Sequence, residues 1–260
     1  MIRSLWTAAT GMNAQQLNMD VIANNLANAS TTGFKQSRAN FEDLMYQNIV
    51  TPGAQTSNDS QLPVGIQVGM GTKTVSVQKN FTQGNFTETS NKLDLAIEGK
   101  GFFKVLRGDE EVYTRAGAFK MDSEGFIVDS EGNRLQPEIS IPLEATNINI
   151  ESGGTLTAMD QSGNVLATET INLYNFPNEG GLLSTGRNYF TPTEASGEAV
   201  EGDPGKEGAG SILQGFLESA NVNVVTEMVN MIIGQRAYEA SSKAIKAADE
   251  MLQLANNVRS

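Results

Sequence analysis

The stretch "SLWTAATGMNAQQLNMDVIANNLANASTTGFK" (residues 4–35) decides the fold class, because a helical pattern runs through most of it. Apolar residues recur every seven positions, at Leu5, Met12, Met19 and Leu26. Ala9, Gln16 and Ala23 follow four positions later, and Ala8 and Ile22 flank this row. The spacing predicts a helix over residues 4–29 with a narrow apolar stripe and Ser4 as its N-cap. We expect Gly33 to end this segment with a positive φ and Phe34 to anchor the next one.

A second helical pattern covers residues 222–258. Its apolar heptad positions are Val224, Met231, Tyr238, Ile245 and Leu252. Met228, Gln235, Ser242 and Asp249 occupy the other half of the heptad. Asn221 or Asn223 is expected to cap the helix. At about 1.5 Å per residue, this helix would be roughly 50 Å long and the first one roughly 37 Å. The heptads favour coiled-coil-like pairing, although the polar half of the seam makes it weaker than a stable zipper.

The middle of the chain has a different character and contains all seven prolines. Short alternating runs, separated by Gly, Asn, Asp and Pro, occur at 72–80, 93–107, 111–122, 125–129, 146–150 and 169–176. This pattern predicts a meandering all-β domain between the two helices, and therefore an α+β fold. The Gly- and Glu-rich residues 195–210 are predicted to form a surface loop.

The segment "YQNIVTPGAQTSNDSQLP" (residues 46–63) fits neither pattern. It is too polar for a core strand, and Pro52, Gly53 and Pro63 indicate turns. We expect an extended connection without clear periodicity over residues 34–71, of the kind that is usually functional or disordered. The expected organisation is thus a helical domain from residues 1–33 and 222–260, this connection, and a β-rich domain over residues 72–221.

The composition excludes several kinds of active site. The chain has no Cys and no His, which removes the usual zinc sites, thiol nucleophiles and a Ser-His-Asp triad. "VGMGTK" (68–73) lacks the spacing of a phosphate loop. "DSEG" occurs at Asp122–Gly125 and at Asp129–Gly132 without the rest of a calcium loop, which favours two β-turns. We therefore expect no enzyme, catalytic residue, metal or cofactor.

The net charge of −12 is unevenly distributed. Residues 1–40 carry +2 and residues 218–260 carry −1, so the middle carries −13. This argues against nucleic acid or an anionic membrane surface as a partner. The N-terminus has no continuous apolar region, so we expect no secretory signal peptide and no direct membrane insertion. The nearly neutral helices are free to pair with each other, with other copies, or with both.

Several stretches together resemble the bacterial flagellar rod and hook proteins. Residues 4–35 are similar to the N-terminal signature of this family, and "NVNVVTEMVNMIIGQRAYEASSKAIKAADEMLQ" (221–253) is similar to its C-terminal signature. "EGKGFFKV" (98–105) and "YTRAGAFKMDSEGFIVD" (113–129) resemble the start of its β domain. The length and residues 46–63 are similar to the distal-rod members of the family, whereas hook members are usually longer and lack this insertion.

The resemblance implies a structural subunit that self-assembles into a straight hollow tube, the drive shaft that transmits motor torque to the hook and filament. The terminal helices would pair at the inner face of this tube and the β domain would form the outer layer. The implied partners are other copies, proximal rod proteins, hook protein, the peptidoglycan- and outer-membrane-ring proteins, the rod cap and the flagellar type III export apparatus. The implied location is the basal body, where the rod crosses the periplasm to the outer membrane.

The resemblance also assigns candidate residues. On the N-terminal helix, the expected subunit interface comprises Leu5, Met12, Met19, Ile22, Asn24, Asn25, Leu26 and Asn28. On the C-terminal helix it comprises Val224, Met228, Met231, Tyr238, Ile245 and Leu252. Neutral amides can hydrogen-bond neighbouring subunits without the desolvation cost of charge, although solvated asparagines are the alternative. Tyr46, Pro52, Gly53 and Pro63 mark an expected rod-stiffening segment. Alternatives are a proximal rod or hook protein, and a secreted carbohydrate-active β protein with coiled-coil ends.

Overall fold

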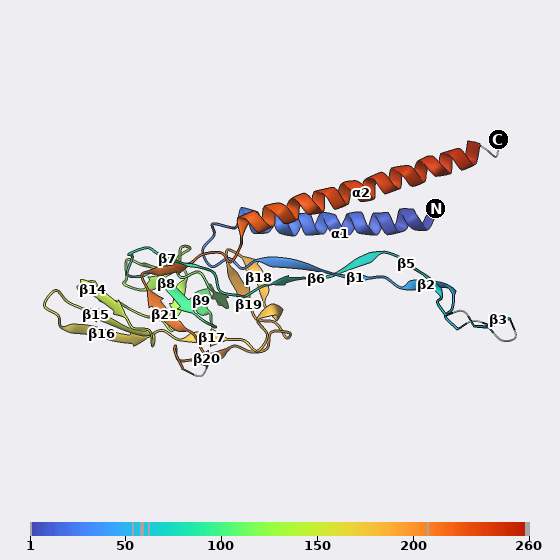
Figure 1. Cartoon of the computed structure of the whole chain (residues 1–260). Coiled ribbons are helices and arrows are strands. Elements are labelled where there is room, and N and C mark those ends of the chain that lie inside the picture. Colours follow the sequence, from blue (N-terminus) through green and yellow to red (C-terminus); the bar gives the residue numbers. More distant parts are fainter. Residues whose placement is uncertain (1, 54, 58–59, 62, 207, 258–260) are drawn as a thin grey trace. The chain divides into compact units, whose positions relative to one another are not determined.

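The computed structural model describes residues 2–53, 55–57, 60–61, 63–206 and 208–257 (Figure 1). The fold is α+β, with a helix at each end of the described chain and strands between them. The residues group into two compact units. The helix–hairpin unit comprises Met1–Leu26, Ser37–Gln78 and Asn223–Ser260, and the β unit comprises Ala27–Gln36 and Lys79–Val222.

Two helices of the described chain, α1 (Ile2–Ala27) and α2 (Val224–Asn257), confirm the predicted terminal helices. They run antiparallel, and they separate toward the two chain ends (Figure 1). The expected N-cap of α1 is wrong, because the helix already begins at Ile2 and Ser4 lies inside it. The backbone N–H of Thr226 donates to Asn223 Oδ1 at 3.1 Å, so Asn223 caps α2. Residue 258, the last residue of the predicted C-terminal helix, lies outside the described residues.

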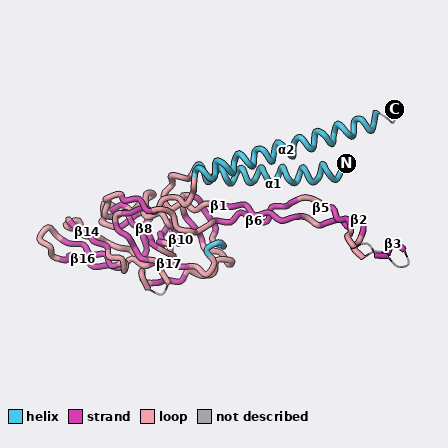
Figure 2. Tube along the Cα trace, viewed as in Figure 1, coloured by secondary structure: helices cyan, strands magenta, loops and turns pink. Residues whose placement is uncertain are grey.

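A two-stranded β-ribbon completes the helix–hairpin unit (Figure 2). Strand β1 (Ser37–Asp43) pairs with β6 (Thr72–Lys79), β2 (Tyr46–Val50) with β5 (Ile66–Gly69), and β3 (Gln55–Ser57) with β4 (Ser60–Gln61). In the β2–β5 ladder, Tyr46 lies opposite Gly69 and Val50 opposite Ile66.

Residues 46–63, for which the sequence shows no clear periodicity, therefore contain the strands β2, β3 and β4. The strand pattern was hidden because β2 and β5 are exposed along most of their length. A strand that covers no core need not alternate apolar and polar residues. Residues 54, 58–59 and 62 of this segment lie outside the described part.

The β unit is built mainly of strands, as predicted, but it is not a simple meander, because strands far apart in the sequence pair with each other. Its largest described sheet has the strand order β11-β12-β13-β9-β10-β19-β18. These strands are Lys120–Met121, Ile127–Val128, Arg134–Gln136, Phe103–Arg107, Glu110–Thr114, Tyr189–Thr191 and Leu183–Gly186. A second sheet is formed by β14 (Asn147–Ile150), β15 (Thr155–Met159) and β16 (Val165–Thr170).

Shorter ladders connect the rest of the β unit. Strand β17 (Leu173–Asn175) pairs with β20 (Val200–Gly202), β8 (Leu95–Glu98) with β21 (Ser211–Gln214), and β7 (Phe86–Glu88) with β22 (Phe216–Glu218). A 3₁₀ turn, η1, spans Glu179–Gly181. The predicted loop at residues 195–210 thus contains β20, and its residue 207 lies outside the described part.

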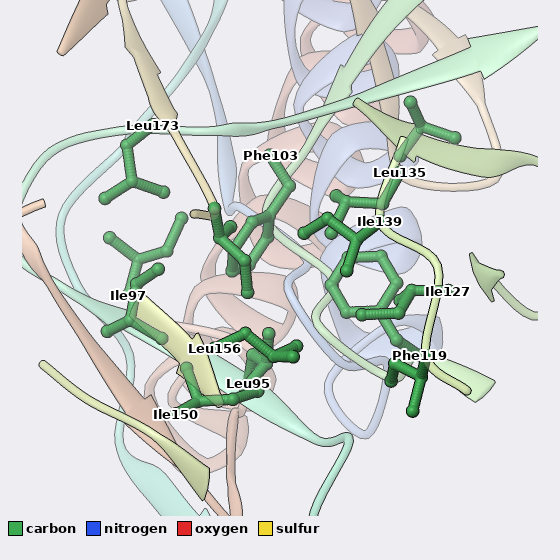
Figure 3. Packing of buried hydrophobic residues seen from close by; sticks show 14 of the residues in the cluster. Leu95, Ile97, Phe103, Phe119, Ile127, Leu135, Ile139, Ile150, Leu156 and Leu173 are labelled. Carbon is green, nitrogen blue, oxygen red and sulfur yellow. The ribbon is translucent and has the colours of Figure 1, made fainter. Parts of the chain in front are cut away.

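The β unit has its own apolar core, shown in Figure 3. Phe103, Val105, Leu135 and Leu156 are fully buried there. Lys104, which lies between Phe103 and Val105 on β9, points away from this core. Aromatic rings form a second cluster, in which Phe102 and Phe190 meet edge to face with centroids 5.8 Å apart. The β unit can therefore fold around its own core without using the apolar stripes of the helices.

Both DSEG motifs form turns in this unit. The backbone N–H of Gly125 donates to Asp122 O, and that of Gly132 donates to Asp129 O. Gly33 has a φ of +69°, as predicted, and a Cβ there would lie 2.6 Å from Ala116 N.

Candidate assembly surface

Small residues allow α1 and α2 to approach each other. A Cβ at Gly234 would lie 3.3 Å from Met19 Cγ, and a Cβ at Gly11 would lie 3.5 Å from Ser241 Oγ. Seven positions separate Gly234 from Ser241, and seven positions later Ala248 is buried. The contact therefore follows a heptad row, in the direction expected for an antiparallel pair.

The second half of this heptad seam differs from the prediction. The row that α2 turns inward is Glu227, Gly234, Ser241 and Ala248, rather than Met228, Gln235, Ser242 and Asp249. Positions one residue apart differ by about 100° around a helix, so this shift exposes Met228. The first half of the predicted seam is partly buried at Met231, Ile245 and Leu252, whereas Val224 and Tyr238 are exposed.

Asn25 ties α1 to α2 and to the hairpin. Its Nδ2 donates to Glu227 Oε2 at 3.1 Å and to Ser37 O at 2.8 Å, and its Oδ1 accepts from Ser37 N at 2.9 Å. Asn25 and Glu227 are both buried. The amide therefore satisfies groups within this chain, because a buried amide or carboxylate without partners is costly.

The other candidates on α1 lie in varied surroundings. Ile22 is buried, and Leu5, Met12, Met19 and Leu26 are partly buried. Asn24 is exposed, and Asn28 Oδ1 accepts from Thr31 Oγ1 at 3.2 Å.

The stiffening candidates all lie on the exposed ribbon. Tyr46, Pro52, Gly53 and Pro63 are exposed. Gly53 has a φ of +82°, a backbone conformation that suits glycine. A hydrogen bond to Asp43 raises the pKa of Tyr46, with the charge of that carboxylate acting in the same direction.

Exposed apolar side chains concentrate on the helix–hairpin unit. Of the 25 large apolar side chains that are exposed in the described part of the chain, 19 belong to this unit. On α2 they include Val225, Val229, Ile232 and Ile233, a row that the sequence analysis did not single out. Large apolar patches on an otherwise folded surface indicate a site for another protein.

The two units also differ in net charge. The helix–hairpin unit contains seven basic and eight acidic residues, whereas the β unit contains 11 basic and 22 acidic residues. Charge is depleted in interface cores, so the nearly neutral unit is the better candidate for close contact between copies.

A groove lies within the helix–hairpin unit. It is lined by residues of α1 and α2 and by Val68 and Gly69 at the end of β5, and its volume is about 1260 Å³. Trp6, which is 67% exposed, lines it together with Arg3. Trp6 was also missed in the sequence analysis, because it falls outside the heptad row.

Two other features are absent from the described residues. Among the described side chains, no three His, Cys, Asp or Glu residues lie close enough together to hold a metal ion. Within the same part of the chain, no helix is long and apolar enough to cross a membrane.

Comparison with known proteins identifies the family. Residues 5–35 match the family described as flagella basal body rod protein, and residues 213–258 match the flagellar basal body rod FlgEFG protein C-terminal family. Residues 96–158 match the flagellar hook protein FlgE/F/G D1 domain. The flagellar basal-body rod protein FlgG of Buchnera aphidicola subsp. Acyrthosiphon pisum is 48% identical over 256 residues, covering 97% of this chain and 98% of the relative. The chain belongs to the FlgG family of flagellar basal-body rod proteins.

Other FlgG relatives match along the whole chain. The FlgG protein of Borreliella burgdorferi is 46% identical over 263 residues, which is 100% of this chain and 99% of the relative. The FlgG protein of Caulobacter vibrioides is 46% identical over 262 residues, covering 100% of both chains. The predicted relationship to flagellar rod proteins is confirmed. The similarity extends over the whole sequence, including the segment of the ribbon as well as the helices.

Proposed function

We propose that this chain is a structural subunit of the distal flagellar rod, a straight hollow polymer that transmits motor torque to the hook and filament. The observation that carries the proposal is the placement of 19 exposed large apolar side chains on one nearly neutral unit, while the β unit has a separate core. Such a surface needs a partner in water, and the FlgG relatives are named as basal-body rod proteins.

The helices carry the main contacts along this polymer. Neighbouring copies meet through the candidate residues of α1 and α2 given above other than Asn25 and Ile22, which are buried within the chain, and α1 and α2 pair in a coiled-coil-like layer. The contacts of Gly11 and Gly234 support a close layer of this kind. The helices with residues 1–33 and 222–260 form the assembly domain, and the β-rich residues 72–221 form a separate domain. Residues 34–71 form an arm, to which β6 also contributes because it pairs with β1.

The ribbon stiffens the polymer. A tube bends when subunits slide along their long contacts, and an arm laid across neighbours adds contacts that must break in every bent state. Tyr46, Ile49 and Val64 expose apolar surface for such contacts, and Pro52 and Pro63 restrict backbone adjustment.

The remaining partners follow from the position of a distal rod. They are proximal rod proteins, hook protein, the ring proteins of the peptidoglycan and outer membrane, the rod cap and the type III export apparatus. The chain is exported through this apparatus and acts where the rod crosses the periplasm. It performs no chemical reaction.

Negative-stain microscopy of the concentrated protein tests the proposal. Straight tubes are expected for a distal-rod subunit, curved tubes would indicate a hook-type subunit, and discrete particles at all concentrations would contradict a polymer subunit. Ile245→Asp and Met231→Asp, which place a charge in the helix layer, should abolish tubes. Leu166→Asp, at an exposed position of β16 in the β unit, is the matched control and should leave tubes intact.

A further inference from the structure

The ribbon of the helix–hairpin unit is interrupted between an inner half, β1 with β6, and an outer half, β2 with β5. Two residues separate β1 from β2, and two separate β5 from β6. Within this break the backbone N–H of Leu44 donates to Gly71 O at 2.8 Å. Because the regular ladder stops at the break, the outer half can take a direction different from that of the inner half.

Helix α1 contacts the ribbon at this break. The backbone N–H of Thr72 donates to Thr10 Oγ1 at 3.3 Å, and the same hydroxyl donates to Thr7 O at 2.9 Å. The threonine hydroxyl therefore acts as acceptor and donor at once. Residues 69–72 are partly buried, whereas the rest of β5 and the middle of β6 are exposed.

Gly71 allows the ribbon backbone to lie directly on α1. Its φ is +115°, and a Cβ there would lie 2.2 Å from Thr10 Oγ1 and 3.5 Å from Thr7 Cα. A side chain at this position would be strained and would also push the ribbon away from the helix. Gly69 differs, because a Cβ there would lie 3.4 Å from the Tyr46 ring, which is an ordinary contact. The close approach thus requires a glycine at position 71 and not at position 69.

A second attachment holds the other end of the inner half. Asn25 of α1 forms its two hydrogen bonds with the backbone of Ser37, the first residue of β1. Thr10 and Asn25 are 15 positions apart, which is about 22 Å of helix. Ser37 and Leu44 are seven positions apart, which is about 23 Å of strand. The equal lengths indicate that the inner half runs along α1 between the two attachments (Figure 1).

The side of α1 between these attachments is not free surface. Ala14 and Val21 are buried, and about 100° per residue places both within about 40° of Thr10 around the helix. An isolated two-stranded ribbon is marginally stable in water, so the inner half gains from a helix that supports it. The outer half, beyond the break, has the attachment at Thr10 and Gly71 as its nearest point of support.

We propose that Thr10 and Gly71 form a clasp that fixes the direction of the outer half of the ribbon relative to α1. Gly71 is then a positioning residue of the arm. This inference rests on the proposed function and adds what holds the arm in place. An arm that pivots at the break would follow a bending neighbour, whereas an arm fixed to α1 opposes the bend.

Cross-linking within single chains tests the clasp, because the sequence has no cysteine. Thr7→Cys/Lys73→Cys places exposed thiols on either side of the clasp and leaves Thr10 and Gly71 intact. Tubes from a mixture of nitrogen-15-labelled and unlabelled chains are treated with a short bismaleimide and digested. Mass spectrometry of the linked peptides should show fully labelled and fully unlabelled pairs, which arise within one chain. Thr7→Cys/Gln78→Cys, with the second thiol about 16 Å farther along β6, is the control and should give no such pairs.

The outcomes separate the clasp from the proposed function. Tubes that give no linked peptides would overturn the clasp and leave the rod subunit standing. Mixed labelled and unlabelled pairs would also overturn it, because they show that the ribbon contacts α1 of another copy. Discrete particles from the wild-type chain at every concentration would overturn the rod subunit and the positioning role with it.

Substitutions measure the positioning role of Gly71. Gly71→Ala should form tubes whose persistence length falls to that of a variant lacking residues 47–62, while the matched control Gly69→Ala should keep the wild-type value. Thr10→Val, which keeps the shape and removes the acceptor, should cause a smaller decrease. Thr10→Ala/Gly71→Ala should be no more flexible than Gly71→Ala, because both changes break the same contact.

Two results would overturn this role. Tubes of Gly71→Ala that are as straight as those of Gly69→Ala would show that the arm keeps its direction without the clasp. Loss of tubes from Gly71→Ala alone would show that the glycine serves assembly itself. The cross-link within single chains does not depend on stiffness, so it decides the contact even where the stiffening role of the arm fails.

Discussion

Lys35 Nζ lies 2.8 Å from Glu218 Oε1, and each side chain is only 1% exposed. Lys35 belongs to the segment after α1 and Glu218 to the segment before α2, so their pair fastens both stretches of chain inside the β unit. Nη1 of the buried Arg115 lies 3.6 Å from Glu218 Oε2. Two cations therefore share one carboxylate. Burial lowers the pKa of Lys35 below its ordinary value, and the charge of Arg115 lowers it further.

Because two buried cations share one carboxylate, removing the Glu218 carboxylate should destabilise the β unit more than removing the Lys35 ammonium group. Glu218→Leu leaves two buried cations without their carboxylate and should destabilise the β unit by about 3–5 kcal/mol. Lys35→Met leaves the Arg115–Glu218 pair, and Thr82 O still accepts from Asn221 Nδ2, so it should cost about 1 kcal/mol. Urea unfolding followed by near-ultraviolet circular dichroism of the tyrosines measures both. Equal losses for the two variants would contradict the shared carboxylate.

Tyr189 should make the β unit sensitive to alkali. Burial raises the pKa of Tyr189, and its hydrogen bond to the Asp129 carboxylate adds to this effect. The unfolded tyrosine releases its proton near pH 10, below the folded pKa, so this stabilisation is full below about pH 10 and is lost as the pH rises above it. Tyr189→Phe should flatten the decline of the urea midpoint between about pH 9 and 11. A decline as steep as that of the wild type would contradict this role.

Gly234 should set the distance between α1 and α2. Gly234→Ala places a Cβ about 3.3 Å from the flexible Met19 side chain and should preserve tubes, since alanine is the better helix former. Gly234→Leu adds a branched side chain that this space cannot hold, and it should abolish tubes while the β unit stays folded. Electron microscopy and circular dichroism measure the two effects. Normal tubes from Gly234→Leu would show that the helices are not closely paired in the polymer.

The ribbon is predicted to govern straightness rather than assembly. Deletion of residues 47–62 removes β3, β4 and all of β2 but Tyr46, and it keeps the helix contacts, so tubes should form but bend more easily. The persistence length of negatively stained tubes measures this change. Tubes as straight as the wild type would contradict a stiffening role, and complete loss of tubes would show that the arm is needed for assembly itself.

The isolated chain is predicted to be a monomer with disordered ends. The helix–hairpin unit leaves much of its apolar surface exposed, and ordering must offset roughly 1–2 kcal/mol per residue of backbone entropy. Limited proteolysis should trim both ends and leave a β-rich core. Fluorescence of Trp6, the one tryptophan of the sequence, should report a solvated indole before assembly and a shielded one in tubes. A full-length monomer that resists protease would contradict this prediction.

The sequence by itself determined the two helices, part of the strands of the β unit and the turn at Gly33. Each of these leaves a local signal. Leu5, Met12 and Met19 repeat at a helical period, and Phe103 and Val105 alternate with Lys104 on a strand that has one buried face. Gly33 lies in a run of small polar residues that ends the helical pattern. Such periods are set by backbone geometry and need no knowledge of a distant partner.

Only the tertiary structure decided which residues meet across long separations. The antiparallel approach of α1 selects Glu227 and Gly234 of α2 over Met228 and Gln235, because the partner sets which side of the helix is inward. The ribbon pairs Tyr46 with Gly69 through backbone hydrogen bonds that leave no apolar alternation. Lys35 and Glu218 give no local signal at all, since the free energy of a buried ion pair depends on a charge that the fold brings from 183 residues away.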